Sequence, residues 1–293
     1  MNRLVRQGFL GDNSDSILAG VTIGLVGLGG GGSHVAQQAA HIGIGGYVLV
    51  DPDRIDLGNT NRLVGGRLSD VVLRSFKTAI AARTIRGLNP LARLCEIRKP
   101  WQDATEDLKR CDVIIGAVDS FREREQLERF ARRYLIPYID MGMDVHDLPS
   151  GGYLVSGQVI MSSPGHPCLR CCGLITDDRL REEARRYGAA GGRPQVVWPN
   201  AILASTAVGL AVQLVTPWHG KSTPFVYLSY DGNKGTVVPS PRTAVLHNAR
   251  CPHHPADETG DPHFDIRSHL AWCPGAPRAP RWQTWLRRLG LLK

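Results

Sequence analysis

The sequence predicts an α/β protein with a mostly parallel sheet covered by helices on both faces. Through residues 1–140, short apolar segments of strand length alternate with helix-like segments, and this alternation is typical of a parallel sheet with crossover helices. A glycine-rich turn follows the first apolar segment, and an aspartate ends the second. Together these features have the arrangement of a nucleotide-binding βαβ unit, so we expect a Rossmann-like fold.

The expected elements follow in order along the chain. Strands are predicted at residues 23–28, 46–50, 92–97, 113–118 and 136–140, and helices at 34–41, 77–86 and 122–134. After Gly142 the pattern changes, because residues 151–161 and 225–238 predict an antiparallel extension with a turn at 231–235. Between these strands we expect a polar, mobile stretch at 177–193 and an apolar core helix at 200–214.

The glycine-rich turn has the form G-x-G-x-x-G, carried by Gly27, Gly29 and Gly32. The first glycine permits a tight turn, the second lets the backbone approach a phosphate, and the third lets the helix pack close to the strand. The helix that follows offers free N–H groups to an anion. Asp51, at the end of the second apolar segment, can accept hydrogen bonds from ribose hydroxyls. The default interpretation of this motif alone is an NAD-dependent oxidoreductase.

The residues around the motif favour a triphosphate over NAD. The additional turn residues and the charged or polar residues that follow are Gly30, Gly31, Ser33, Asp53, Asn59, Arg62 and Lys77. A dehydrogenase has no need of an Asn–Arg–Lys set here, whereas a forked arginine and a lysine point charge neutralise phosphate oxygens. Any one of these residues alone is interpreted as a solvated surface group. The set, in this order after a glycine-rich turn, predicts an ATP site.

In these motifs the chain resembles the bacterial ThiF/MoeB/HesA branch of the ubiquitin-activating superfamily. The matching segments are Arg6-Gln7, Gly27 to Ser33, Asp51 to Arg62, Lys77, and Asp119-Ser120 with Arg124. The resemblance covers residues 1–175 well and residues 176–255 loosely. One departure is Leu63, which stands where the family has glutamine.

The resemblance implies an ATP-dependent adenylyltransferase. Such an enzyme binds MgATP and activates the C-terminal carboxylate of a small ubiquitin-like or sulfur-carrier protein as an acyl-adenylate, with release of pyrophosphate. By resemblance, the catalytic residues are Arg6, Arg62, Lys77 and Asp119, with Asp119 as the Mg²⁺ ligand, and the nucleotide is bound by Gly27, Gly29, Gly30, Gly32, Asp51, Asp53, Asn59, Arg62, Lys77 and Arg124. The family's N-terminal arginine reaches into a neighbouring subunit, which implies a homodimer.

Simpler roles exist for three of these residues. Asp119 also fits the N-cap of the helix at 122–134, and Arg124 fits a solvated charge on that helix. Arg6 lies before the first strand and fits a disordered N-terminal arm.

Two Cys/His pairs predict a structural metal site. Cys168 and Cys171 form a C-x-x-C pair, and Cys251 and His254 form a C-x-x-H pair much further along the chain. Three thiolates and one imidazole suit a tetrahedral Zn²⁺ ion. The family has pairs at both places, although its second is usually C-x-x-C. His253 and Cys273 are alternative fourth ligands, and a redox C-x-x-C or unligated thiols are the alternative to a metal.

No cysteine is placed to accept the activated carboxylate. Family members that form a thioester carry a reactive cysteine after the first metal pair, but residues 177–199 contain none. Cys172 adjoins that pair, whereas Cys95 and Cys111 fall on expected core positions. The sequence therefore supports adenylation and does not support a thioester step.

Composition limits the partners and the compartment. The chain has 293 residues, 42% hydrophobic and 21% charged, and a net charge of +8. Five positive charges lie within the segment 277–293, at Arg278, Arg281, Arg287, Arg288 and Lys293. The rest is only mildly basic, so DNA binding is not expected, while a tRNA-linked or peptide carboxylate stays as an alternative substrate.

The chain is expected to be cytoplasmic. The segment 1–20 is polar and lacks the pattern of a signal peptide. Seven cysteines, an odd number, suggest a reducing compartment with metal or thiol chemistry. The apolar run at 196–218 contains Pro199, Asn200 and Gln213, so it is interpreted as a buried helix and no membrane span is expected.

Three segments are predicted. Residues 1–20 form an N-terminal arm, and residues 21–255 form the adenylation domain, with a nucleotide-binding half at 21–165 and a zinc- and substrate-binding half at 166–255. Residues 256–293 form a basic tail. Its Trp282, Trp285, Leu286 and Leu289 fit one helical stripe that can dock on the body or on a partner.

Overall fold

The computed structural model of the chain describes residues 3–185, 194–220, 223–246, 249–254 and 259–260. These residues lie in one unit that spans Met1–Gly260. Apart from residues 259–260, the predicted tail at 256–293 falls outside the described residues, as does Cys273. The expectations for the tail and for Cys273 therefore stay predictions.

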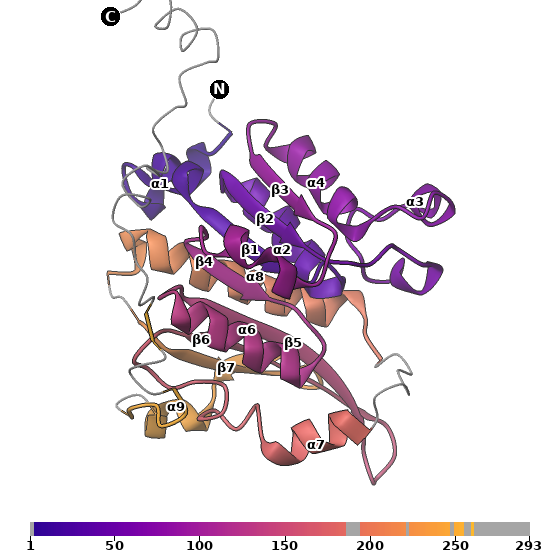
Figure 1. Cartoon of the computed structure of the whole chain (residues 1–293), viewed down its shortest axis with the longest axis vertical. Helices are drawn as coiled ribbons and strands as arrows, with labels where there is room; N and C mark the ends of the chain where they lie inside the picture. Colours follow the sequence, from indigo (N-terminus) through magenta and orange to yellow (C-terminus); the bar gives the residue numbers. More distant parts are fainter. Residues whose placement is uncertain (1–2, 186–193, 221–222, 247–248, 255–258, 261–293) are drawn as a thin grey trace, which may run out of the picture. The chain divides into compact units, whose positions relative to one another are not determined.

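The elements that position the functional site are named here as in Figure 1. The strands are β1 (Thr22–Val26), β2 (Gly46–Val50), β3 (Arg93–Ile97), β4 (Val113–Gly116), β5 (Tyr138–Asp147), β6 (Tyr153–Ser162), β7 (Val226–Asp231) and β8 (Thr236–Pro239). The helices are α1 (Ser14–Gly20), α2 (Gly30–Ile42), α3 (Leu68–Val72), α4 (Lys77–Leu88), α5 (Thr105–Leu108), α6 (Phe121–Arg133), α7 (Asp177–Arg185), α8 (Val197–Val215) and α9 (Pro241–Leu246). Short 3-10 helices are η1 (Val5–Leu10), η2 (Leu57–Asn59), η3 (Trp101–Ala104) and η4 (Pro217–His219).

A single eight-stranded sheet forms the centre of the fold, in the order β3-β2-β1-β4-β5-β6-β7-β8. The pairs from β3 through β5 are parallel, and those from β5 through β8 are antiparallel. This confirms the predicted parallel sheet with an antiparallel extension. The chain runs outward from β1 to β3 and then returns to place β4 on the other side of β1. Open α/β sheets bind ligands at such a reversal of strand order, beyond the carboxyl ends of the strands.

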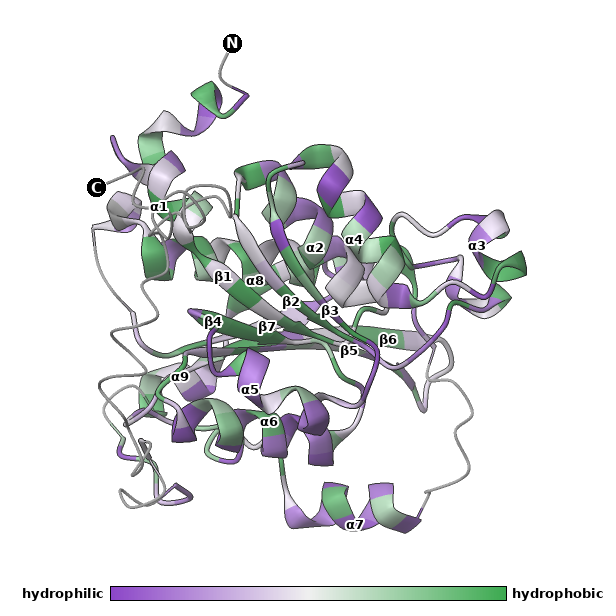
Figure 2. Cartoon of the chain, turned by 45° about the horizontal axis from the view of Figure 1, so that its top comes forward, coloured by the Kyte–Doolittle hydropathy of each residue, from purple (hydrophilic) through white to green (hydrophobic). Residues whose placement is uncertain are grey.

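Alternating side chains on the strands build one core on each face of the sheet. On β1, Leu25 belongs to the first cluster of buried residues and Val26 to the second, and on β2 the same holds for Leu49 and Val50. The first cluster is completed by α1, α2, α4 and α8, and the second by α5 and α6. Figure 2 shows these two sets of helices on opposite sides of the sheet, as the period-two alternation of strand side chains requires.

Helix α8 is a core helix of this fold. It is long and apolar enough to cross a membrane by length and composition alone. It packs instead against α2, β5 and β6, and buries residues such as Leu203 and Ala207 in the first cluster. Pro199 falls in its first turn, where no intrahelical N–H bond is lost. The interpretation of this run as a buried helix is confirmed.

Three regions differ from the expectation. The strand expected at 136–140 continues to Asp147, because β5 pairs along its whole length with β6 in a long hairpin. The polar stretch expected at 177–193 begins with helix α7, whose first turn carries Asp177 and Asp178 where a helix favours acids. The segment expected as an N-terminal arm forms η1 and α1, and buries Leu10 and Leu18 against the main core.

Candidate functional site

The glycine-rich turn connects β1 to the first turn of α2, and its glycines are needed for different reasons. Gly27 has φ +86°, a conformation that favours glycine. A Cβ on Gly32 would lie 1.9 Å from the Gly27 carbonyl oxygen, so this position must stay bare for the helix to meet the strand. A Cβ on Gly29 would meet no heavy atom within 4 Å, so Gly29 faces open space. Gly29 is also the N-cap of α2 and has no side chain to bind the N–H groups of the first turn.

The two additional glycines of the turn make room for neighbouring side chains. A Cβ on Gly30 would lie 2.6 Å from Nδ2 of Asn200, and one on Gly31 would lie 2.6 Å from Cε of Met141. Asn200 is on α8 and 5% exposed, and its Nδ2 donates to the carbonyl of Val196. The run of glycines therefore lets α8 and β5 close over the start of α2.

Asp51 is a fixed, buried carboxylate at the end of β2. One oxygen accepts the N–H of Leu28 at 2.7 Å, and the other accepts the N–H of Asp53 at 2.8 Å. Burial raises the pKa of Asp51, although nearby Lys77 and the two N–H groups act in the opposite direction. The bond from Leu28 holds the carboxylate against the glycine-rich turn.

The expected phosphate-binding residues lie on two neighbouring segments. Lys77 is the first residue of α4, and its Nζ lies 2.8 Å from Oδ2 of Asp53. Arg62 follows η2 and donates through Nη1 to the carbonyl of Gly58 at 2.6 Å. Asn59 ends η2, where its Oδ1 accepts the N–H of Asp56 at 3.3 Å. Local hydrogen bonds therefore restrain each side chain before any ligand binds.

Asp119 follows β4 and faces the same space. The N-cap of α6 is Ser120, whose Oγ accepts the N–H of Glu123 at 3.2 Å, so the alternative role of Asp119 as this cap does not apply. Asp119 Oδ1 instead accepts Nε2 of Gln195 at 3.1 Å. The carbonyl of Gln195 accepts Nδ2 of Asn61 at 3.1 Å. Gln195 thus bridges the end of β4 and the segment that follows β2.

These residues line one cavity of about 310 Å³. From the predicted nucleotide set it includes Gly27, Gly29, Gly30, Asp51, Asp53, Asn59, Arg62, Lys77, Asp119 and Arg124. Gly32 is not a lining residue because it lies behind the turn, against Gly27. The sequence reasoning missed the lining residues Trp101, Glu123, Met141, Gln195 and Asn200. They come from segments far from the glycine turn and carry no motif that reasoning from one sequence could have used.

Arg6 lies far from the cavity of its own subunit. It is exposed in η1. On either side of it, Arg3 Nη1 donates to the carbonyl of His41 and Gln7 Nε2 donates to that of Ile42, both at the C-terminal end of α2. The cavity is at the N-terminal end of that 13-residue helix, about 18 Å away at 1.5 Å per residue. The structure therefore does not bring Arg6 together with the other predicted residues within one chain.

Arg124 is buried at the edge of the cavity. Its Nη1 donates to Oδ2 of Asp140 at 2.6 Å and to the carbonyl of Met141 at 3.2 Å. Asp140 is fully buried and also accepts the hydroxyl of Tyr138 at 3.1 Å. A Cβ on Gly142 would lie 2.4 Å from Nη2 of Arg124, so this glycine lets the guanidinium lie against β5. The alternative of a solvated helix charge does not apply to Arg124.

A second, larger hollow of about 760 Å³ adjoins the cavity. Arg124, Gly142 and Met143 line both spaces. Its other lining residues come from β5, β6, β7 and α7, among other segments, and include the small residues Ser156, Gly157 and Ser229. We call this space the groove. It leads from the antiparallel part of the sheet to the nucleotide-sized cavity.

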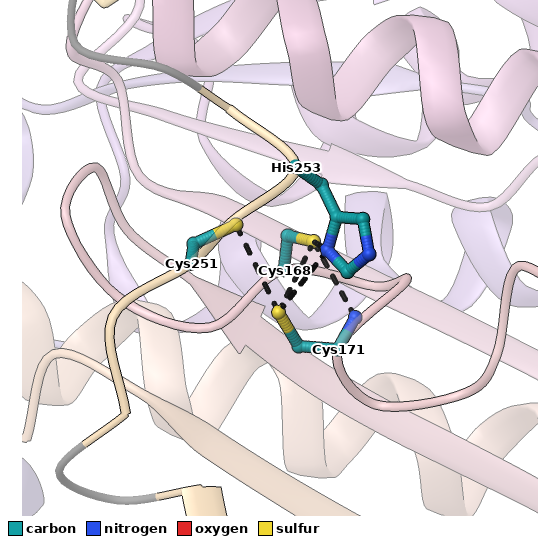
Figure 3. A group of neighbouring side chains, drawn as sticks. All are labelled: Cys168, Cys171, Cys251 and His253. Carbon is teal, nitrogen blue, oxygen red and sulfur yellow. Dashed lines mark hydrogen bonds between the residues drawn. The ribbon is translucent and has the colours of Figure 1, made fainter.

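The structure also brings together Cys168, Cys171, Cys251 and His253 (Figure 3). Their ligand atoms all lie within 4.8 Å of one another, with the Cys168 and Cys171 Sγ atoms 3.6 Å apart and His253 Nδ1 3.4 Å from Cys171 Sγ. A hydrogen bond with Cys168 and the N–H groups of His253 and His254 lower the pKa of Cys251 to about 4. Such a group of side chains can hold a metal ion.

His253, the alternative fourth ligand, groups with the three cysteines, and His254, the ligand that the sequence favoured, groups with Cys168 and Glu128. His254 Nε2 instead lies 3.9 Å from Oε2 of Glu128, a carboxylate that is 1% exposed. Glu128 also accepts the N–H of Leu169 and the hydroxyl of Ser162. The two adjacent histidines therefore belong to two neighbouring groups that share Cys168.

Cys172 lines the groove but is a poor nucleophile. Its side chain is almost fully buried, and burial raises its pKa to about 12. Burial also raises the pKa of Cys95 and of Cys111. These three thiols are therefore protonated near neutral pH, which agrees with the expectation that the sequence does not support a thioester step.

Comparison with known proteins identifies the family. The model of the ThiF family matches residues 1–253. The chain belongs to the ThiF family. The ThiF-family chain is 30% identical over 257 residues to the sulfur carrier protein adenylyltransferase of Thermus thermophilus, covering 84% of this chain and 90% of that protein. It is 32% identical over 149 residues to the SAMP-activating enzyme E1 of Haloferax volcanii, covering 50% of this chain and 51% of that enzyme.

The chain is also similar to two further proteins. The ThiF-family chain is 32% identical over 135 residues to the tRNA threonylcarbamoyladenosine dehydratase of Escherichia coli, covering 45% of this chain and 50% of that enzyme. The match spans about half the length of the dehydratase and of the SAMP-activating enzyme. The fold of the chain is that of E. coli MccB solved with AMPCPP and MccA, with a TM-score of 0.66, 19% identity, and coverage of 82% and 71% of the two chains.

Proposed function

We propose that this ThiF-family chain is an ATP-dependent adenylyltransferase. Its substrate would be the C-terminal carboxylate of a small ubiquitin-like or sulfur-carrier protein, which attacks the α-phosphorus of ATP to give an acyl-adenylate and pyrophosphate. The observation that carries the proposal is the convergence of Asn59, Arg62, Lys77 and Asp119 with the glycine-rich turn in one cavity. The names of the Thermus thermophilus and Haloferax volcanii relatives support it.

Each side of the cavity has a distinct role in the proposal. Asp51, fixed by the Leu28 and Asp53 N–H groups, would bind the ribose hydroxyls. Arg62 and Lys77 would neutralise the phosphates, with Lys77 leaving Asp53 for the more highly charged triphosphate. Asp119 would hold Mg²⁺, which supplies further neutralisation of phosphate charge when bound. Gln195 would then exchange its bond to Asp119 for another partner.

Catalysis would come from positioning and charge neutralisation. The reacting carboxylate is itself the nucleophile, so no protein side chain has to form a covalent bond. The groove supports this mechanism, because it meets the cavity at Arg124 and Gly142 and gives an extended peptide a path to it. Small residues such as Gly157 leave room for the backbone of that peptide next to the sheet.

We propose that Arg6 completes the site of a second subunit in a homodimer. The hydrogen bonds of its neighbours to the far end of α2 keep it out of the cavity of its own chain. An arginine from a partner subunit would add positive charge next to the transferring phosphate.

We also propose that the metal at the cysteine cluster is Zn²⁺. Around a tetrahedral zinc with Zn–S of about 2.3 Å and Zn–N of about 2.0 Å, sulfur atoms lie about 3.8 Å apart. The Sγ atoms of Cys171 and Cys251 are 3.8 Å apart, which supports this metal. The reduced cysteines that such a site requires fit a cytoplasmic enzyme.

Three alternatives are testable. The name of the Escherichia coli relative supports a tRNA-linked carboxylate as the second candidate substrate, and MccB, solved with MccA, makes a peptide carboxylate a third. An NAD-dependent oxidoreductase explains Asp51 and the glycines but gives no role to Arg62, Lys77 or Asp119.

Pyrophosphate exchange tests the proposed function directly. The purified chain with a carrier protein ending in Gly-Gly is expected to incorporate labelled pyrophosphate into ATP, and Lys77→Met is expected to reduce the rate at least ~100-fold, since a charge that stabilises the transferring phosphate is lost. Arg98→Met, which removes a charge outside the cavity, is the matched control. Exchange that depends on total tRNA would favour the second candidate. Binding of NAD without any exchange would reject adenylation.

A further inference from the structure

The N-terminal end of α6 holds a carboxylate from another part of the chain. Glu183, on α7, accepts the N–H of Phe121 at 2.9 Å and the N–H of Arg122 at 3.0 Å. It also accepts the hydroxyl of Ser120 at 3.2 Å. Backbone N–H groups and the positive end of a 13-residue helix form an anion site. In this structure a glutamate side chain fills it.

This anion site lies where the cavity and the groove meet. Asp119 and Glu123, on either side of Ser120, line the cavity, and Phe121 and Glu183 line the groove. Arg124, one helical turn into α6, lines both. A carboxylate that arrives along the groove therefore reaches the end of α6 before it reaches the nucleotide.

Arg124 provides a second and independent indication of a ligand. It is 6% exposed, and its Nε has no hydrogen-bond partner among the described residues. Asp140 and Met141 both accept from another nitrogen, Nη1. A buried guanidinium nitrogen without a partner costs free energy, and a carboxylate is the group that arginine binds best.

Helix α6 has a cap of its own besides Glu183. Ser120 already caps it through the N–H of Glu123. Helix α7 buries none of its residues, and an ion pair joins its Asp177 to Arg170 of the body. Burial, and next the charge of Glu183, raise the pKa of Glu123, so Glu183 lies close to another carboxylate. The carboxylate of Glu123 therefore opposes the charge of Glu183, and this repulsion favours displacement of Glu183 by another anion.

We propose that the N-terminal end of α6, together with Arg124, is the subsite for the substrate carboxylate, and that Glu183 occupies this subsite until the substrate displaces it. The proposal rests on the proposed function, because it assigns the place where the free carboxylate lies before it attacks ATP. Glu183 is then an internal competitor that imitates the substrate. Binding of the substrate releases the end of α7 from α6.

The test measures peptide binding to the full chain in the presence of AMPCPP and Mg²⁺. The probes are a fluorescent octapeptide that ends in Gly-Gly with a free carboxylate and the same peptide with a C-terminal amide. Glu183→Gln is expected to bind the acid peptide about tenfold more tightly, as it would if the competitor fills the subsite about nine-tenths of the time. Binding of the amide peptide should not change. Asp178→Asn, which removes one negative charge from the same helix outside the groove, is the matched control.

Several results would overturn the proposal. Glu183→Gln would bind the acid peptide no better, or more weakly, if Glu183 were a structural cap. An equal gain in Asp178→Asn would show a general charge effect. A second measurement uses the unmodified chain and so does not depend on the folding of a variant. The acid peptide, but not the amide peptide, should speed tryptic cleavage at Arg179 and Arg181 of α7. Protection of these sites would contradict displacement of Glu183. Failure of the chain to bind AMPCPP would instead reject the proposed function.

Discussion

In the glycine-rich turn, two similar substitutions are predicted to have different effects, one on stability and the other on nucleotide binding. Gly29→Ala and Gly32→Ala each add one methyl group to the same turn. A Cβ at position 29 meets no heavy atom within 4 Å, whereas one at position 32 lies 1.9 Å from the Gly27 oxygen and 2.9 Å from its carbonyl carbon. Carbon atoms prefer contacts of about 3.5–4.0 Å. The backbone of Gly32 or of Gly27 must therefore move by roughly 1 Å or more.

The turn has little freedom to make this movement. Gly27 donates its N–H to Val50, and a Cβ on Gly27 would itself lie 2.5 Å from the Ala117 oxygen. We therefore expect Gly32→Ala to lower the free energy of unfolding by about 3 kcal/mol, the upper end for overpacking. For a domain of this size that lowers Tm by about 6–12 °C. Gly29→Ala should change stability by less than about 0.5 kcal/mol.

Gly29→Ala is expected to affect nucleotide binding instead of stability. Because Gly29 faces the cavity, its added methyl group keeps phosphate oxygens away from the N–H groups of α2. Gly29→Ala should weaken AMPCPP binding at least tenfold, or about 1.4 kcal/mol. Thermal unfolding and titration calorimetry measure the two effects separately. If Gly29→Ala unfolds as early as Gly32→Ala, the packing argument is wrong, and if it binds AMPCPP normally, the phosphates do not lie on this turn.

Two further predictions concern the metal cluster and α3. His253→Ala should lose the bound metal and lower Tm, whereas His254→Ala should retain it, as measured by metal content after gel filtration, and the opposite pattern would assign the ligand to His254. Asp70 accepts two hydrogen bonds from Arg83 at 2.7 Å and is 3% exposed. Asp70→Asn should therefore lower the free energy of unfolding by about 1–3 kcal/mol at pH 7. Arg83 lowers the pKa of Asp70, so this stabilisation is complete above the ordinary value of 3.8 and is lost as the pH falls through the lower folded value. In urea unfolding, the difference in unfolding free energy between the unmodified chain and Asp70→Asn should disappear below pH 3.8. A difference that stays constant with pH would contradict this account.

The sequence predicted the parallel half of the fold well because that half is buried. Strands such as β2 read as continuous apolar runs, and helix α4 between strands carries a clear amphipathic period. The antiparallel half was predicted less completely. Its hairpin of β5 and β6 extends past the core, where Asp144 and His146 interrupt the apolar pattern. Pairing between the two strands, which local sequence does not encode, stabilises the hairpin there.

The residues of the candidate site also differ in how well the sequence predicted them. Residues within the glycine turn and the segment after β2 could be predicted, because one continuous motif carries them. Asn200 and Gln195 could not, since they reach the cavity only through the packing of α8 against α2. Glu183 gave no signal because a glutamate in a charged helix is usually solvated. Only its three hydrogen bonds to the start of α6 distinguish it.

The change of strand direction at β5 has a consequence for how the family can diversify. Parallel strands carry the nucleotide cavity, and antiparallel strands β6 and β7 supply much of the groove wall. Groove residues such as Tyr227 and Ser229 do not line the nucleotide cavity, and distant substitutions act additively on stability. On the proposed function, we expect mutations there to change the choice of substrate and to leave ATP binding unchanged. In the proposed enzyme, one sheet thus separates the residues of the reaction from those that would select the substrate, and a library confined to β6 and β7 is expected to explore new substrates at little cost to the chemistry.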